Sequence, residues 1–327
     1  MTPASKRENG LDVFRLLAAF AVITVHVGFF ESFNSEEVSS ILRLSGRWAV
    51  PFFFILTGFL ISRNNSSTRA LSPLVKALTI FSIAFLLLIP LSVANYGFHE
   101  TLVRVFSSGI FLSGSYFHLW YLSSVVVGLL ILLALEKQEL GRLIPYVACI
   151  SILMYLVMGA YNPLTESGIK VARHLSSVGF LYIGIKLKDI PASAARGLTF
   201  VIIGFVMQII EAQTLTYFLP GKNILKFQFL VGTVFFAIGA FDLARSLNSN
   251  SFDVLGKLGA RHSLSIYIFH PYFIFAFKYL PISSYLSDLL IIPSVFLSSL
   301  LLSMLLDTYT PRFYKIVNGN LSFLKNK

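Results

Sequence analysis

Charged side chains are scarce in this chain of 327 residues, because Asp, Glu, Lys and Arg make up only 13% of it and hydrophobic residues make up 56%. A soluble domain carries about 25% charged residues, so this chain could not cover the surface of a soluble fold. Each membrane-spanning helix needs about 20 apolar residues. The composition therefore predicts an all-α, polytopic membrane protein whose helical bundle forms one domain over residues 1–327, with no soluble domain.

Cysteine and the sequence motifs of hydrolases are also missing. Cys149 is the single cysteine, so no internal disulfide can form, and no Cys/His spacing fits a metal site. It lies in an apolar run, and we interpret it as a packing residue. The chain has no HExxH, no G-x-S-x-G, no phosphate-binding glycine loop and no acidic pair in the centre of an apolar run. These absences argue against hydrolysis by a metal, a serine triad or a carboxylate dyad.

Apolar runs separated by polar segments predict about ten spanning helices. Asp12 and Arg15 interrupt the first run, which argues against a cleaved signal peptide, so we expect the first helix to stay in the mature protein. The expected ranges are 11–31, 47–62, 73–94, 118–135, 143–160, 174–187, 197–216, 227–244, 262–280 and 286–306.

The distribution of basic residues predicts the orientation of these helices. With the N-terminus inside, 17 of the 26 Lys and Arg residues fall in inner segments and 8 in outer segments. Basic residues are enriched on the cytoplasmic side, so both termini are expected in the cytoplasm. Trp48 and Trp120 then both fall at the outer interface, where indole rings are favoured. The net charge of +11 is spread over short loops without a dense basic block, so we expect membrane lipids and not nucleic acid as partners.

The first predicted helix carries three polar residues that are costly in a membrane, namely Asp12, Arg15 and His26. Arg15 and His26 differ by only about 20° around a helix and by about 16 Å along its axis, so they share one face. Asp12 precedes Arg15 by one turn and can pair with it. The pair could be an interfacial anchor, and His26 could simply bond a neighbouring helix. Alternatively, a neutral histidine is the usual general base.

Two other predicted helices carry polar groups, and so does the loop after residues 47–62. His118 and Trp120 begin the range 118–135, and His270 lies in 262–280, where Ser263 and Tyr267 share its face. Hydrogen bonding within the core is an equal alternative for His270. In the loop, Arg69 and Lys76 form either an anion site or a topology signal.

With these residues assembled, the chain resembles acyltransferase family three, a family of ten-helix bacterial membrane proteins that acylate cell-surface carbohydrates. The resemblance rests on four segments in family order. These are LDVFRLLAAFAVITVH, VPFFFILTGFLIS, HLWYL and SLSIYIFHP. The segment STRALSPLVKALT departs from the family, whose members often carry clustered arginines there.

The resemblance implies an O-acyltransferase, most directly an O-acetyltransferase, of the bacterial inner membrane. It looks like the short, stand-alone form, similar to enzymes that O-acetylate enterobacterial common antigen or exopolysaccharide. The donor would be cytoplasmic acetyl-CoA or another acyl-CoA, with no permanently bound cofactor and no metal. The acceptor would be a lipid-linked or surface glycan. The resemblance also implies roles for the residues that match positions of the family.

His26 matches the essential histidine of the family and Arg15 its paired basic residue. Together with Asp12 they would form the catalytic group. Arg15, Arg69 and Lys76 would bind the phosphates of the donor, and the substrate-binding residues would be His118, Trp120, Tyr267 and His270. A transporter or flippase for a glycan or lipid is the alternative, because histidine and arginine inside a membrane also mark transport pathways.

Overall fold

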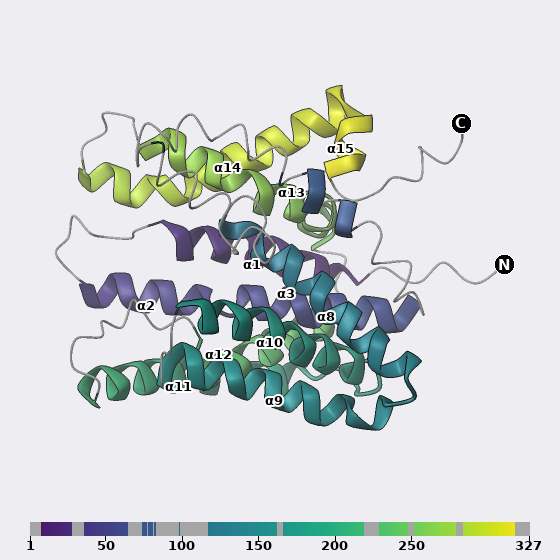
Figure 1. Ribbon diagram of the computed structural model, residues 1–327. Coiled ribbons are helices and arrows are strands. Elements are labelled where there is room, and N and C mark those ends of the chain that lie inside the picture. Colours follow the sequence, from purple (N-terminus) through teal and green to yellow (C-terminus); the bar gives the residue numbers. More distant parts are fainter. Residues whose placement is uncertain are drawn as a thin grey trace. The chain divides into compact units, whose positions relative to one another are not determined.

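The computed structural model describes residues 8–27, 36–64, 74–76, 78–80, 82, 98, 117–161, 166–218, 229–247, 252–278 and 284–317. Within these ranges nearly every residue is helical and none lies in a strand (Figure 1). The all-α prediction is therefore confirmed.

The described helices fall into two compact units. The first unit holds α1 (Asn9–His26), α2 (Glu36–Gly46), α11 (Ala194–Phe218), α12 (Val231–Ser246), α13 (Asp253–Lys278) and most of α14 (Ser284–Tyr309). The second holds α8 (Trp120–Lys137), α9 (Ile144–Leu156), a π-helical turn (Val157–Tyr161), α10 (Glu166–Leu187) and α15 (Pro311–Val317). α3 (Ala49–Asn64) begins in the first unit and ends in the second. A helical bundle can contain two such units, so the single domain over residues 1–327 stays a prediction.

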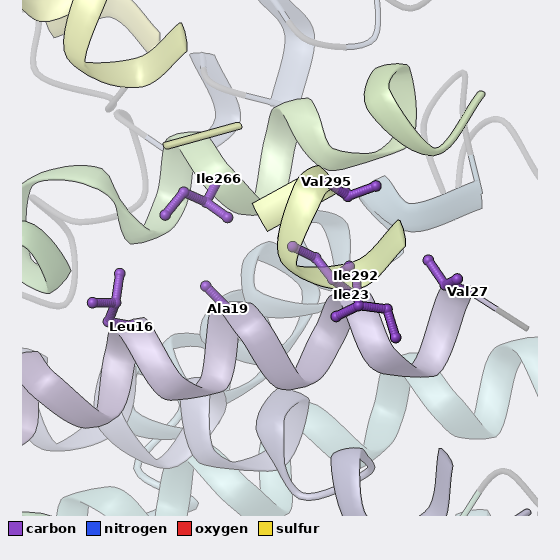
Figure 2. Close-up of a cluster of buried hydrophobic side chains, with 7 residues drawn as sticks. All are labelled: Leu16, Ala19, Ile23, Val27, Ile266, Ile292 and Val295. Carbon is purple, nitrogen blue, oxygen red and sulfur yellow. The ribbon is translucent and has the colours of Figure 1, made fainter. Parts of the chain in front are cut away.

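In the first unit, α1 packs along α13 and α11 packs along α12. One apolar stripe on α1 faces α13 and α14, and its residues recur every three or four positions, as the helical period requires. The stripe and its partners are drawn in Figure 2: Leu16, Ala19, Ile23 and Val27 from α1, Ile266 from α13, and Ile292 and Val295 from α14. The angular positions of Arg15 and His26 place both at one edge of this stripe. The packing of α1 on α13 therefore positions the polar residues of both helices.

The second unit is built around close contacts between α8, α10 and the second half of α3. A Cβ atom added at Gly58 or Gly184 would collide with a backbone carbonyl of the facing helix, at Leu181 and Ile55 respectively. Small residues let membrane helices approach this closely. The ring of Phe54 lies 5.0 Å from that of Tyr121, centroid to centroid. The start of α8 is thereby fixed against α3.

Six described helices are long and apolar enough to cross a membrane. They are Asn9–His26, Ile41–Arg63, Trp120–Lys137, Gly141–Tyr161, Ala194–Phe218 and Leu290–Tyr309. These overlap the expected ranges 11–31, 47–62, 118–135, 143–160, 197–216 and 286–306. These six helices therefore support the prediction that the chain is a membrane protein.

The other four expected spans are not confirmed. The ranges 174–187, 227–244 and 262–280 fall on α10, α12 and α13, which are helical but are not among the six. α12 has 16 residues, fewer than the about 20 that a straight span needs. Most of the range 73–94 lies outside the described residues. The count of about ten and the cytoplasmic termini stay predictions.

Two details differ from the sequence-based expectations. Helix α1 ends at His26, because Val27 has extended backbone with φ −92° and ψ 132°, so the predicted end at residue 31 is wrong. Cys149 is exposed and not a packing residue. It lies on α9 beside the exposed apolar residues Tyr146, Ile150 and Leu153. An apolar, exposed stripe on a spanning helix is suited to lipid contact.

Candidate active site

The two polar residues at the start of α1 form the expected ion pair. Nη1 of Arg15 donates to Oδ1 of Asp12 at 3.2 Å. Both side chains are partly buried, with 27% of Arg15 and 13% of Asp12 exposed. The Nε of Arg15 is buried and has no hydrogen-bond partner among the described residues. Asp12 thus binds Nη1 of the guanidinium, and Nε can donate to a further acceptor.

This end of α1 is fixed by a close approach to α13. A Cβ atom at Gly259 of α13 would collide with the backbone carbonyl of Asp12. The missing side chain lets the two helices touch, and it sets the depth at which Asp12 and Arg15 lie beside α13.

At the other end of α1, His26 lies face to face with His270 of α13. The ring centroids are 5.5 Å apart and the rings are inclined by 24°. His270 is fully buried, whereas His26 is partly buried. The sequence places the two histidines on separate predicted helices, and the packing of α1 on α13 brings them together.

The orientation of the His270 ring is set by its own helix. Its Nδ1 lies 2.6 Å from the carbonyl oxygen of Tyr267. A carbonyl oxygen can only accept, so Nδ1 carries a proton and, in a neutral ring, the lone pair is on Nε2. Ser263 and Tyr267, the other residues of this face of α13, are both buried. Their burial agrees with the face expected from the sequence.

The remaining predicted site residues lie elsewhere. His118 is buried in the short 3₁₀ turn Phe117–Leu119, and Trp120 is the first residue of α8. Both belong to the second unit. Lys76 is exposed, and Arg69 lies outside the described residues. The structure therefore brings together His26 with His270 and Asp12 with Arg15, and the roles of all these residues stay predictions.

Sequence reasoning missed two polar pairs. Nε of Arg196 on α11 donates to Oδ2 of Asp242 on α12 at 2.8 Å, and Oγ of Ser123 on α8 lies 3.2 Å from Nε2 of His174 on α10. The acidic Asp242 within the apolar range 227–244 could have identified the first pair. His174 is the first residue of the expected range 174–187, and nothing in the sequence pairs it with Ser123.

The chemistry available in the first unit is that of proton transfer and anion binding. A partly buried imidazole, stacked on a buried one, can accept a proton from a hydroxyl group. The guanidinium of Arg15 can bind an anion. Across the described part of the chain, no group of three or more His, Cys, Asp and Glu residues could hold a metal ion.

Comparisons with known proteins identify the family of the chain. An acyltransferase domain model, that of acyltransferase family 3, matches residues 8–308. Two amino-acid racemases of Enterococcus faecalis are 32% and 33% identical over 162 and 143 residues, which cover 49% and 41% of this chain and 23% and 20% of the relatives. A serine/alanine racemase of Enterococcus gallinarum is 29% identical over 141 residues, or 39% of this chain and 20% of the relative. No solved structure matches the chain.

The chain matches only 20% to 23% of the length of these curated relatives, so their racemase names describe those proteins and not this one. The domain model, by contrast, covers most of the chain from residue 8 to residue 308. It includes every described helix that carries the paired histidines and the Asp12–Arg15 pair. The chain therefore belongs to acyltransferase family 3.

Proposed function

We propose that this acyltransferase is an O-acetyltransferase of the bacterial inner membrane. It moves an acyl group from cytoplasmic acetyl-CoA, or another acyl-CoA, to a hydroxyl of a lipid-linked or surface glycan. The stacking of His26 on His270 carries the proposal, because it places a titratable base where α1 and α13 meet. Such a pair is costly within a bundle of apolar helices and marks a functional site.

In this proposal His26 is the catalytic group. It removes the proton from the acceptor hydroxyl, or it carries the acyl group as a transient acyl-imidazole. General-base catalysis contributes roughly 10²–10⁴ in rate. His270 and Tyr267 bind the acceptor beside it, and the bond from His270 to the Tyr267 carbonyl keeps the His270 ring in one orientation.

Arg15 binds an anionic part of the donor. The phosphates of coenzyme A would supply the acceptor that the buried Nε of Arg15 lacks among the described residues. Asp12 positions the guanidinium through the 3.2 Å bond. Arg69 and Lys76 add positive charge for the same phosphates, and His118 and Trp120 bind the glycan at the outer interface.

Radiolabelled acetyl-CoA, incubated with membranes that contain the full chain, tests this function. We expect label in a glycolipid, and none with membranes from cells that lack the protein. A transporter or flippase would instead move unmodified glycan across the membrane without transfer of label. Movement of glycan together with the absence of label in any product would overturn the proposal.

A further inference from the structure

The second unit contains a buried hydroxyl–imidazole pair that the proposed function does not use. Oγ of Ser123 on α8 lies 3.2 Å from Nε2 of His174 on α10. Both residues are almost fully buried, with 3% of Ser123 and 1% of His174 exposed. A nucleophile and a base at about 2.6–3.2 Å, with the base oriented by a third group, form the pattern of an activated nucleophile.

The third group in this pattern is a backbone carbonyl. Nδ1 of His174 lies 2.6 Å from the carbonyl oxygen of Lys170, one turn earlier on α10. Because this oxygen can only accept, Nδ1 carries a proton, and a neutral ring presents its lone pair at Nε2. The serine hydroxyl is then the only possible donor of the bond between Ser123 and His174, and its single hydrogen can point either to Nε2 at 3.2 Å or to the Trp120 carbonyl at 2.9 Å. The bond to the Lys170 carbonyl thus holds the imidazole in the orientation in which Nε2 can accept a proton from Ser123.

Neighbouring serines show the ordinary alternative. Oγ of Ser124 donates to the carbonyl of Trp120 at 2.7 Å, and Oγ of Ser177 donates at 2.7 Å to the carbonyl of Ser124. Serines in membrane helices commonly bond backbone carbonyls in this way. Ser123 also lies 2.9 Å from the carbonyl of Trp120, but an imidazole nitrogen is within its reach as well. The imidazole acceptor distinguishes Ser123 from the other two, whose acceptors are all backbone carbonyls.

A cation is held against Trp120, whose indole ring also contacts His174. The guanidinium carbon of Arg173 lies 4.4 Å from the ring centroid of Trp120, and the same indole is in edge contact with His174 at 6.1 Å. Trp120 therefore touches both the base and the cation. Positive charge beside a nucleophile stabilises the oxyanion that forms when a carbonyl group is attacked.

We propose that Ser123 and His174 form a second acyl-transfer site, in which Ser123 accepts the acyl group of a thioester as a covalent ester. Oγ of Ser123 attacks the thioester carbonyl while its proton passes to Nε2 of His174. The carbon–sulfur bond breaks, and the thiolate takes this proton and leaves as a free thiol. An acceptor hydroxyl then attacks the ester, its proton passes through His174 to Oγ, and Ser123 is regenerated.

This inference rests on the proposed function for its donor, because acyl-CoA supplies the thioester. Ser123 lies within a helix, so the G-x-S-x-G turn of soluble hydrolases is absent around it. Serine–histidine pairs are recognised by geometry and not by sequence position. In the predicted orientation, Ser123 and His174 lie near the outer ends of their helices, on the side where the glycan is expected.

The test is to trap the ester. Membranes that contain the full chain are incubated with radiolabelled acetyl-CoA without added glycan, quenched in acid and mapped by peptide mass spectrometry. We expect acetyl on Ser123 in the wild type and at least a tenfold loss of this adduct in Ser123→Ala and His174→Gln. Ser124→Ala, one residue away and equally buried, is the matched control and keeps the adduct.

A second variant guards against a folding defect in Ser123→Ala. Ser123→Cys keeps a nucleophile, and the adduct should become a thioester that neutral hydroxylamine removes. If wild-type membranes transfer acetyl to a glycolipid in a reaction that requires His26, and Ser123 carries no acetyl, the second site is refuted and the proposed function stands. If no acetyl transfer of any kind occurs, the proposed function is refuted, and the second site is refuted with it because acyl-CoA is its donor.

Discussion

At the scale of single residues, the central feature of the first unit is the stacking of His26 on His270. His26 is the last residue of α1 and is partly buried, whereas His270 is fully buried and bonded to the Tyr267 carbonyl. In the proposed function, the partly buried ring of His26 is the one that a substrate hydroxyl approaches. The buried ring of His270 stacks on that of His26, and its Nδ1 is bonded to the Tyr267 carbonyl.

His270→Phe separates the contribution of ring packing from that of hydrogen bonding. Phenylalanine keeps an aromatic ring against His26 but has no ring nitrogen, so packing is retained and hydrogen bonding is lost. We expect the variant to insert and to elute from a sizing column in detergent like the wild type. Acetyl transfer from acetyl-CoA should fall at least about fivefold, since a bound group that is left without its hydrogen bond to His270 costs about 1–3 kcal/mol. Wild-type transfer rates would show that His270 acts by packing alone.

Sequence reasoning found most of these residues but not their partners. Helical periodicity gives the face on which Arg15 and His26 lie, and it gave the Asp12–Arg15 pair because both residues are on one helix. It cannot say which helix faces His26, since that depends on how α1 packs against α13. His174 was missed for a similar reason: its significance lies in Ser123, which belongs to another helix.

At the scale of helices, α11 and α12 depend on glycine. A Cβ atom at Gly232 would collide with the backbone of Gln208 and Gly204, and one at Gly239 would lie 2.6 Å from the backbone nitrogen of Val201. Real side chains do not reach such distances, so the helices must separate if either glycine is replaced. The contact between α11 and α12 therefore depends on backbone touching backbone.

Gly232→Val tests this contact. Overpacking of a tight interface costs about 1–3 kcal/mol, so we expect a lower melting temperature in detergent. Gly141→Val is the matched control, because a Cβ atom at Gly141 would meet nothing within 4 Å. Equal melting temperatures for the two variants would show that α11 and α12 do not pack in this way.

The ion pair between the same helices is asymmetric, and its two partners should respond differently to replacement. The Asp242 side chain is 2% exposed and the Arg196 side chain 38% exposed. Arg196→Ala leaves a buried carboxylate without the cation that is hydrogen-bonded to it, whereas Asp242→Asn leaves an arginine that water can still solvate. We expect Arg196→Ala to lower the melting temperature more than Asp242→Asn. The opposite order would mean that the Asp242 carboxylate is not buried in the folded protein.

The scale of helices also shows why one sequence-based interpretation was wrong. Cys149 lies in an apolar run, and such a run in a soluble protein points to the interior. In a membrane helix the lipid-facing side is as apolar as the packed side. The exposed position of Cys149 on α9 could not be distinguished from a buried one by hydropathy.

At the scale of the whole molecule, the excess of Lys and Arg in alternate loops predicts cytoplasmic termini. Single cysteines introduced next to either terminus of a Cys149→Ala chain test this prediction. A membrane-impermeant thiol reagent should label neither terminus in intact cells, and both after the membrane is permeabilised. Labelling of one terminus in intact cells would mean an odd number of spans.

The most direct test of the account is the initial rate of acetyl transfer in two histidine variants. His26→Ala removes the proposed base, and His262→Gln alters a buried histidine of the same unit whose Nδ1 lies 2.8 Å from the Ser303 hydroxyl. We expect His26→Ala to lose at least a hundredfold in rate while it folds and inserts normally, and His262→Gln to stay within a few-fold of wild type. Transfer by His26→Ala at the wild-type rate would contradict the account.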